Sequence, residues 1–183
     1  MSTEDYILFS GAASGSEAFF GETAERWGLQ EVNYSFEGHQ DSRTRGLRVL
    51  KQGELLTGDV SLSYVGKLMG RNYKDTPLFR NVVRSIWHQV NSGQQVFVVG
   101  WINSNGTVKG GTGWGAEFAK LCNKPLYVFD QREAAWFVWQ DGSFTLCETP
   151  PIVTDEHFTG TGTRLLDDGG RQAITALFER SFS

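Results

Sequence analysis

Apolar residues along this chain follow two different spacings, and the two kinds of segment alternate. Strand-like runs, all apolar or alternating, occur at residues 6–9, 29–36, 95–102 and 126–129. Helical spacing of apolar residues occurs at residues 15–27, 76–90 and 173–178. All-apolar runs are typical of strands that are buried on both faces of a parallel sheet. The alternation therefore predicts an α/β fold with a Rossmann-like, mostly parallel sheet and flanking helices.

The rest of the chain adds a hairpin and some irregular segments. Runs of β-forming residues flank Asp141 and Gly142, a strong type I′ turn signal, which predicts a β-hairpin near residues 134–148. Residues 37–48 are polar and indicate a loop, whereas residues 54–71 have roughly helical spacing without clear boundaries. Because its 183 residues contain no linker or repeat, the chain is expected to form a single domain.

Composition narrows the class of protein. The 17 basic and 21 acidic residues give a net charge of -4, which argues against a general nucleic-acid surface. The amino terminus has no apolar signal core, and no apolar run approaches the length that crosses a membrane. Cys122 and Cys147 both have apolar neighbours, which indicates buried free thiols in a reducing compartment. These features predict a soluble cytoplasmic protein with no membrane partner.

Three glycine-rich stretches are the candidates for a functional site. The central one follows the 95–102 run and holds four glycines within six residues: Gly110, Gly111, Gly113 and Gly115. Glycines let a ligand approach the backbone, and in open α/β sheets ligands bind at the carboxyl ends of the strands. Glu117 lies one turn into the helix that these glycines open, and Asp130 ends the next strand. The stretch therefore predicts a βαβ unit with a ligand-binding loop.

The other two stretches have similar chemistry. S-G-A-A-S-G-S-E at residues 10–17 precedes a helical pattern, and Ser14 with Glu17 fits a capping box. F-T-G-T-G-T-R at residues 158–164 is read as a further glycine turn. Unpaired backbone N–H groups and the helix dipole favour an anion at helix starts, and phosphate is the natural ligand. None of the stretches matches a P-loop or dinucleotide fingerprint, and the histidines lack metal-ligand spacing, so we expect neither a cofactor nor a metal site.

Several candidate residues also have an ordinary structural interpretation. Glu117 could simply complement a helix amino terminus, although we favour a functional role. Trp114 could pack in the core or stack on a base, and Asp130 could bind ribose hydroxyls or cap a turn. Arg80 and Arg84 lie on the preceding helix and, taken singly, are more typical of solvated charges. Four glycines in six residues exceed what a turn needs, which favours close approach of a ligand.

The three stretches resemble motifs of the SLOG superfamily, which unites LOG-type phosphoribohydrolases, DprA/Smf-like proteins and YpsA-like proteins. Residues 110–117, G-G-T-G-W-G-A-E, resemble its G-G-x-G-T-x-x-E signature, with Trp114 where the family usually has Thr. Residues 10–17 are similar to the S-G-G-x-x-G-x-D turn of YpsA-like and DprA-like members. Residues 158–164 resemble the G-I-G-T-R element of the DprA side. Together the motifs span most of the chain, in order on a Rossmann-like pattern.

The resemblance implies that the glycine loops hold a small-molecule nucleotide or nucleotide-sugar. The candidate ligand-binding residues are Ser10, Gly11, Ser14, Gly15, Gly110, Gly111, Thr112, Gly113, Trp114, Asp130, Gly160, Gly162, Thr163 and Arg164. In the phosphoribohydrolase members, a motif glutamate and an arginine from the preceding helix act at the N-glycosidic bond of a nucleoside monophosphate. The glutamate maps to Glu117 and the arginine to Arg80 or Arg84, which are the catalytic candidates.

Three functions remain open from the sequence. The leading hypothesis is a sensor or sequestering protein that binds a phosphorylated nucleoside or an NAD-derived nucleotide of the ADP-ribose type. The first alternative is a phosphoribohydrolase that cleaves an N-glycosidic bond, with Glu117 as its carboxylate. The second is DprA-like binding of single-stranded DNA, which the acidic charge makes the weakest of the three. The broad apolar face of residues 76–90 would also allow two copies to pair as a homodimer.

Overall fold

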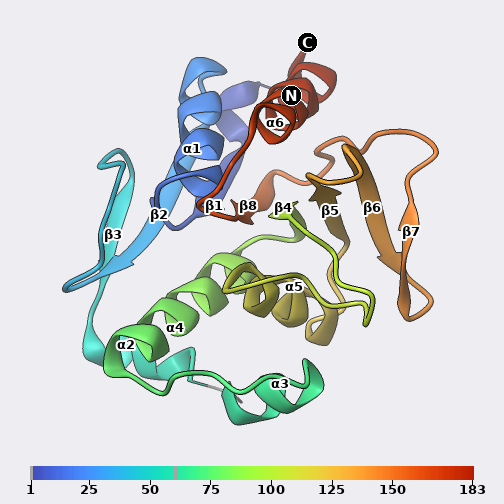
Figure 1. Cartoon of the computed structure of the whole chain (residues 1–183). Coiled ribbons are helices and arrows are strands. Elements are labelled where there is room, and N and C mark those ends of the chain that lie inside the picture. Colours follow the sequence, from blue (N-terminus) through green and yellow to red (C-terminus); the bar gives the residue numbers. More distant parts are fainter. Residues whose placement is uncertain (1, 60–61) are drawn as a thin grey trace.

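The computed structural model describes residues 2–59 and 62–183, and in these ranges an eight-stranded sheet lies between two layers of helices (Figure 1). The strands are β1 (Ile7–Ser10), β2 (Gln30–Phe36), β3 (Leu47–Leu50), β4 (Gln95–Gly100), β5 (Leu126–Asp130), β6 (Ala135–Gln140), β7 (Ser143–Leu146) and β8 (His157–Gly162). The helices are the short 3-10 helix η1 (Thr3–Asp5), α1 (Ser16–Arg26), α2 (Gln52–Thr57), α3 (Leu62–Leu68), α4 (Pro77–Ser92), α5 (Thr112–Leu121) and α6 (Asp168–Phe182). In the described ranges, no helix combines the length and the apolar character needed to span a membrane.

The sheet confirms the predicted α/β class. Its strand order is β3-β2-β1-β8-β4-β5-β6-β7, and the neighbouring strands from β3 to β5 are parallel. The last two strands, β6 and β7, are antiparallel and form the hairpin expected near residues 134–148. At its tip Asp141 and Gly142 both have positive φ, 51° and 79°, as a type I′ turn requires.

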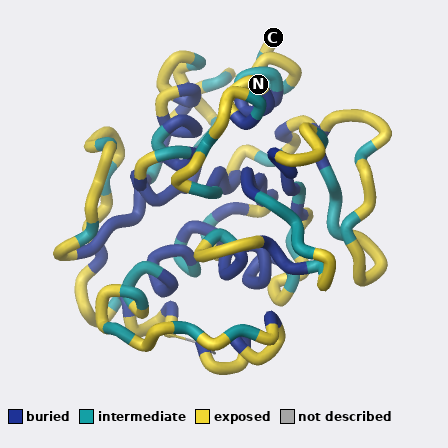
Figure 2. Tube along the Cα trace, in the orientation of Figure 1, coloured by how far each residue is buried: buried dark blue, intermediate teal, exposed yellow. Residues whose placement is uncertain are grey.

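Strand β4 is buried on both faces, which explains its all-apolar sequence. Phe97 and Val99 belong to the cluster that α1 and α6 cover, together with Phe20. Val96 and Val98 belong to the cluster beneath α4 and α5, because successive side chains of a strand point to opposite faces. Figure 1 shows α1 and α6 on one side of the sheet and α4 and α5 on the other, and Figure 2 shows the buried residues concentrated between them.

The structure changes the interpretation of two irregular segments. The loop predicted at residues 37–48 is wrong at its end, because Leu47–Leu50 forms β3 at the edge of the sheet, parallel to β2. An edge strand with an exposed residue such as Val49 lacks the apolar pattern that identifies an interior strand. Residues 54–71 contain the end of α2 and all of α3. Val60, part of the helical spacing in that segment, lies outside the described residues.

The stretch at residues 158–164 is not a turn that opens a helix, so this prediction is wrong. Its residues up to Gly162 belong to β8, which lies between β1 and β4 in the middle of the sheet. Gly160 is required in this strand because a Cβ there would lie 2.5 Å from Cδ1 of Phe20. The next helix, α6, begins only after a further loop.

Two local predictions are also wrong. Ser14 and Glu17 do not form a capping box, because the N-cap of α1 is Gly15 and no side chain caps the helix. The Glu17 carboxylate bonds to the turn and to β8 instead. Cys122 is exposed and Cys147 is half-buried, whereas both were expected to be buried; both are free, as expected.

Candidate functional site

A cavity of about 610 Å³ lies at the carboxyl ends of β1, β8 and β4. The order of the sheet reverses here, since β1 is followed by β2 and β3 on one side and β4 by β5, β6 and β7 on the other. Helices α1 and α5 cover opposite faces of the sheet (Figure 1), and the first turn of each contributes a residue to the cavity lining, Glu17 and Thr112. Its polar and glycine lining includes Glu17, His39, Ser85, Gln89, Lys109, Gly110, Gly111, Thr112, Thr161, Gly162, Thr163 and Arg164.

Helix α4 forms the apolar wall of this cavity. Leu78, Phe79, Val82 and Ile86 line the space at the spacing of one helix face. The wide apolar stripe predicted for this helix thus serves two purposes, because Val83 packs into the core beneath the sheet while its neighbours face the cavity. A planar or apolar part of a ligand can pack against this wall.

The turn between β4 and α5 presents an open helix start. Gly110 has a φ of 71°, and apart from the adjoining backbone no atom of the described residues lies within 4 Å of the place that a Cβ would take at Gly110 or Gly111. Within the part of the chain that the structure describes, the backbone N–H groups of Gly110, Gly111 and Thr112 donate no hydrogen bond. Lys109 lines the same cavity. The free N–H groups and the dipole of a ten-residue helix favour an anion at this turn. The Lys109 ammonium group lies 5.5 Å from the centroid of the Trp101 ring.

Arg71 holds this turn in place from outside the cavity. Its guanidinium donates to the carbonyl oxygens of Gly110 (3.0 Å) and Val108 (2.6 Å) and to Thr107 Oγ1 (3.0 Å). Burial lowers the pKa of the Arg71 guanidinium, and the nearby Glu117 carboxylate acts in the opposite direction. The pKa of an arginine starts so high that Arg71 keeps its charge at neutral pH. The three hydrogen bonds from Arg71 therefore fix the backbone of the β4–α5 turn in its open conformation.

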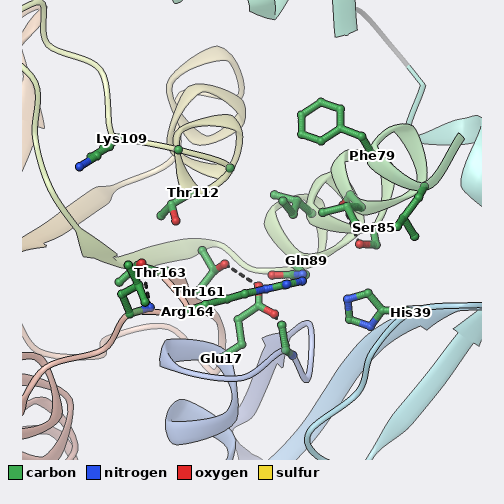
Figure 3. A pocket seen from close by; sticks show the side chains of 18 of the residues that line it. Glu17, His39, Phe79, Ser85, Gln89, Lys109, Thr112, Thr161, Thr163 and Arg164 are labelled. Atoms are coloured by element: carbon green, nitrogen blue, oxygen red, sulfur yellow. Dashed lines mark hydrogen bonds between the residues drawn. The ribbon is translucent and has the colours of Figure 1, made fainter. Parts of the chain in front are cut away.

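Glu17 is the carboxylate of the cavity. Its side chain is buried, Oε2 accepts from Ala13 N (3.1 Å), and Oε1 accepts from Thr161 Oγ1 (2.8 Å). Figure 3 shows the second bond, which joins helix α1 to the end of β8. None of the ion pairs among the described residues involves Glu17. A carboxylate is thus held rigidly beside the space that a ligand would fill.

The turn before α1 is closed by the chain that leaves β8. Gly15 has a φ of 87°, and a Cβ there would lie 2.5 Å from the carbonyl oxygen of Arg164. Ser16 donates to the carbonyl oxygen of Thr163 through its N–H (3.0 Å) and its hydroxyl (2.8 Å). This packing places Thr163 and Arg164 beside the cavity. In Figure 3 the Arg164 side chain extends across the cavity in the direction of Gln89.

Sequence reasoning missed several polar residues of the cavity, among them Ser85, Lys109, His39 and Gln89. His39 lies in the loop after β2, with Nδ1 2.6 Å from Asp41 Oδ1, and Asp41 Oδ2 accepts from Ser35 Oγ (2.9 Å). Gln89 lies on α4, is only 1% exposed, and its Oε1 has no hydrogen-bond partner among the described residues. The aspartate two residues after His39 could have indicated from the sequence that this histidine is held in place by a carboxylate. A single glutamine in an amphipathic helix carries none.

The predicted ligand-binding residues fall into two groups. Those that line the cavity are Gly110, Gly111, Thr112, Gly162, Thr163 and Arg164. The residues of the first turn lie mostly behind it. Ser10 Oγ donates to the carbonyl oxygen of Gly160 (2.6 Å) and so joins β1 to β8, Ser14 is exposed, and Gly11 adjoins the side chains of Glu17 and Gln89.

Gly113, Trp114 and Asp130 do not line the 610 Å³ cavity, although Trp114 lines a second cavity beside the same turn. A Cβ at Gly113 would lie 2.2 Å from a backbone oxygen, so packing alone requires glycine there. Trp114 is buried, and its ring meets that of Tyr73 edge-on at 5.4 Å between centroids. Asp130 caps a turn, since its carboxylate accepts from the N–H of Ile102 (2.7 Å) and from the two residues that follow Gln131.

Glu117, the first catalytic candidate, does not line the cavity. It follows Thr112, the first residue of α5, by five positions, which rotates it by about 140° around the helix axis. Its carboxylate accepts from Lys120 Nζ (2.7 Å) and is buried away from the open turn.

Neither arginine candidate lines the cavity. Arg84 is buried and pairs with Asp59 (3.0 Å), on the side of α4 that faces the end of α2. Arg80 is exposed and pairs with Asp75 at the start of the helix. The cation that the structure places across the cavity is Arg164.

The described residues contain no group of three or more His, Cys, Asp or Glu side chains that could hold a metal ion. In the comparisons with known proteins, no family model, no curated protein and no solved structure matches the chain. The resemblance to the SLOG superfamily therefore rests on the motif residues alone.

Proposed function

We propose that this protein binds a phosphorylated nucleoside or an NAD-derived nucleotide in the cavity and acts as a sensor or sequestering protein. The observation that carries the proposal is the open start of α5, which faces the same cavity as the apolar wall of α4 and a set of buried polar groups. An anion site, a flat apolar surface and a polar floor are the three features that the phosphate, base and sugar of a nucleotide need.

The arrangement suggests where each part of the ligand lies. The phosphate accepts from the N–H groups of Gly111 and Thr112, with Lys109 as its cation. Arg164 approaches from the opposite side of the cavity. The base packs on the α4 wall beside Phe79. The volume of about 610 Å³ lies in the range of roughly 300–1,000 Å³ that is usual for small-molecule sites.

A second cavity, of about 400 Å³, supports the larger NAD-derived ligands within this proposal. It shares Phe79, Lys109, Gly110 and Gly111 with the first cavity, and Tyr73 lines it further out. The two spaces thus adjoin the same open turn. A dinucleotide could place its pyrophosphate at this turn and one nucleoside in each cavity.

The two alternatives have less support. A phosphoribohydrolase that uses Glu117 would need this carboxylate at the ligand, but Glu117 is paired with Lys120 outside the cavity. DprA-like DNA binding is disfavoured by the net charge of -4. A cytoplasmic location and the pairing of two copies through α4 remain predictions from the sequence.

Isothermal titration calorimetry with AMP, ADP-ribose, NAD and adenosine tests the proposal. We expect saturable binding of at least one phosphorylated ligand, and binding of adenosine about tenfold weaker or less, because adenosine has no phosphate. Lys109→Ala should weaken binding by about tenfold, since it removes a charge-assisted hydrogen bond. Lys51→Ala is the control, because Lys51 is exposed and lines neither cavity. Equal affinities for adenosine and AMP would contradict the phosphate site.

A further inference from the structure

Gln89 is a buried glutamine whose side-chain oxygen accepts no hydrogen bond from the described residues. Its side chain is 1% exposed, and Oε1 has no hydrogen-bond partner among the described residues. A buried carboxamide oxygen without a partner lowers stability, because the water that it loses on folding is not replaced. Gln89 lines the 610 Å³ cavity, so a ligand in that cavity can supply the missing donor.

A second buried glutamine shows how the fold satisfies such a group when its role is structural. Gln95 is 3% exposed, its Nε2 donates to the carbonyl oxygen of Ile152 (3.0 Å), and its Oε1 accepts from Thr154 N (3.0 Å). Both ends of the Gln95 carboxamide are therefore bonded. The Gln89 carboxamide, which faces the cavity, has its acceptor left over.

Glu17 and His39 lie near Gln89, so three polar side chains adjoin this part of the cavity. Gln89 Nε2 and Glu17 Oε2 lie 2.3 and 2.5 Å from the place that a Cβ would take at Gly11, so the carboxamide and the carboxylate are neighbours. His39 Nδ1 lies 2.6 Å from Asp41 Oδ1, so a neutral ring that donates through Nδ1 presents Nε2 as an acceptor. Figure 3 shows Glu17, Gln89 and His39 in the same part of the cavity.

We propose that Gln89, Glu17 and His39 form an acceptor subsite that receives an uncharged hydrogen-bond donor of the ligand, with Gln89 as the residue that determines specificity. This inference rests on the proposed function, because it assigns the subsite to one part of the same nucleotide. Two parts of a nucleotide carry such donors, namely the ribose hydroxyls and the exocyclic amino group of the base. The terminal torsion of a glutamine is soft, so Oε1 can turn toward either.

No side chain of the described residues donates a hydrogen bond to Gln89 Oε1. Arg164 extends toward the subsite in Figure 3, but it makes no hydrogen bond to Gln89, whose Oε1 has no partner in the described part of the chain. A phosphate is a poor occupant, because three acceptors would face its oxygens, and its place is the open start of α5. The open start of α5 therefore presents backbone donors, whereas Gln89 and Glu17 present acceptors, and this difference orients the ligand.

The test compares ligands that differ by one donor. AMP, 2′-deoxy-AMP, 3′-deoxy-AMP and purine riboside 5′-phosphate are titrated by calorimetry into the wild type and into Gln89→Met, which keeps the volume of the side chain but removes the acceptor. We expect the wild type to bind at least one analogue about 5- to 30-fold more weakly than AMP. The deoxy analogues identify a ribose hydroxyl, and purine riboside phosphate identifies the amino group. Gln89→Met should bind AMP and that analogue equally.

The outcomes test the phosphate site and the acceptor subsite separately. If the wild type does not discriminate, or if Gln89→Met discriminates as well as the wild type, the subsite is overturned and the phosphate site stands. If adenosine binds as tightly as AMP, the phosphate site fails and the subsite fails with it.

Thermal unfolding gives a second readout that a structural glutamine would not share. Gln95→Met strands the partners at Ile152 and Thr154, so we expect its melting temperature to fall by about 2–10 °C. Gln89→Met removes an acceptor that has no partner, so its melting temperature should equal or exceed that of the wild type. A fall as large as that of Gln95→Met would show a structural role for Gln89 and would overturn the proposal.

Discussion

The two strand–turn–helix units that lead into α1 and α5 have similar sequences but different surroundings. Both contain a glycine turn and a glutamate in the helix that follows. The turn before α1 is filled, because Gly15 packs against the chain that leaves β8 and both oxygens of Glu17 accept hydrogen bonds. The turn before α5 is open, since among the residues that the structure describes none beyond the adjoining backbone comes within 4 Å of the Cβ positions at Gly110 and Gly111.

The difference comes from β8. This strand lies between β1 and β4, and the chain that leaves it bonds to the β1–α1 turn through Ser16 and Thr163. The β4–α5 turn is held by Arg71 from outside the cavity, which leaves its N–H groups free toward the ligand space. The two glycine turns are therefore similar in sequence, but the turn before α1 packs against the chain after β8, whereas the turn before α5 favours an anion. Glycine content cannot tell a packing glycine from one that faces a ligand, whereas the space around its missing Cβ can.

The largest contrast is expected between alanine substitutions in the two turns. Gly15→Ala should lower the free energy of unfolding by about 2–4 kcal/mol, because the new Cβ would meet the backbone of Arg164 at a positive φ. Gly111→Ala, at a φ of -60° in open space, should change it by less than about 1 kcal/mol. Urea unfolding measures both. Equal losses in the two variants would show that both turns are packing turns.

An intermediate contrast is expected between the two glutamates. Glu17→Gln sets an amide donor against the N–H of Ala13 or the hydroxyl of Thr161, and it should cost about 1–3 kcal/mol of stability and weaken nucleotide binding. Glu117→Gln removes the partner of Lys120, and it should also destabilise the protein but leave nucleotide affinity unchanged. Urea unfolding and calorimetric titration of both variants separate stability from binding. Loss of affinity in Glu117→Gln alone would reverse the assignment of the cavity carboxylate.

The smallest expected effect concerns the open turn itself. Gly111→Ala should raise the free energy of unfolding by about 0.4–1 kcal/mol while it weakens nucleotide binding several-fold, because the new methyl group occupies the side from which the phosphate approaches. Gly53→Ala on α2 is the matched control, since its Cβ would also meet nothing within 4 Å but Gly53 lies outside the cavity. Unchanged affinity in Gly111→Ala would place the ligand away from this turn.

Apolar spacing alone determined the class of fold. The run in β4 is apolar at successive positions because both faces of a central parallel strand are covered by helices, and the stripe on α4 has helical spacing because one side of it packs. Asp141 and Gly142 likewise determined the hairpin, since few residue pairs accept two positive φ angles in succession. The glycines before α5 indicated the correct edge of the sheet, because parallel strands share one carboxyl edge.

Only the tertiary structure decided which groups meet at that edge. The central position of β8 depends on pairings such as Ile7 with His157, which join distant parts of the chain and leave no local pattern. That pairing closes one glycine turn and leaves the other open, and the rotation of residues around α5 turns Glu117 away while Glu17 stays beside the cavity. Gln89 lies at the site because the fold places its buried side chain beside the cavity. Its chemistry depends on what surrounds it in space, and no spacing along the chain encodes that.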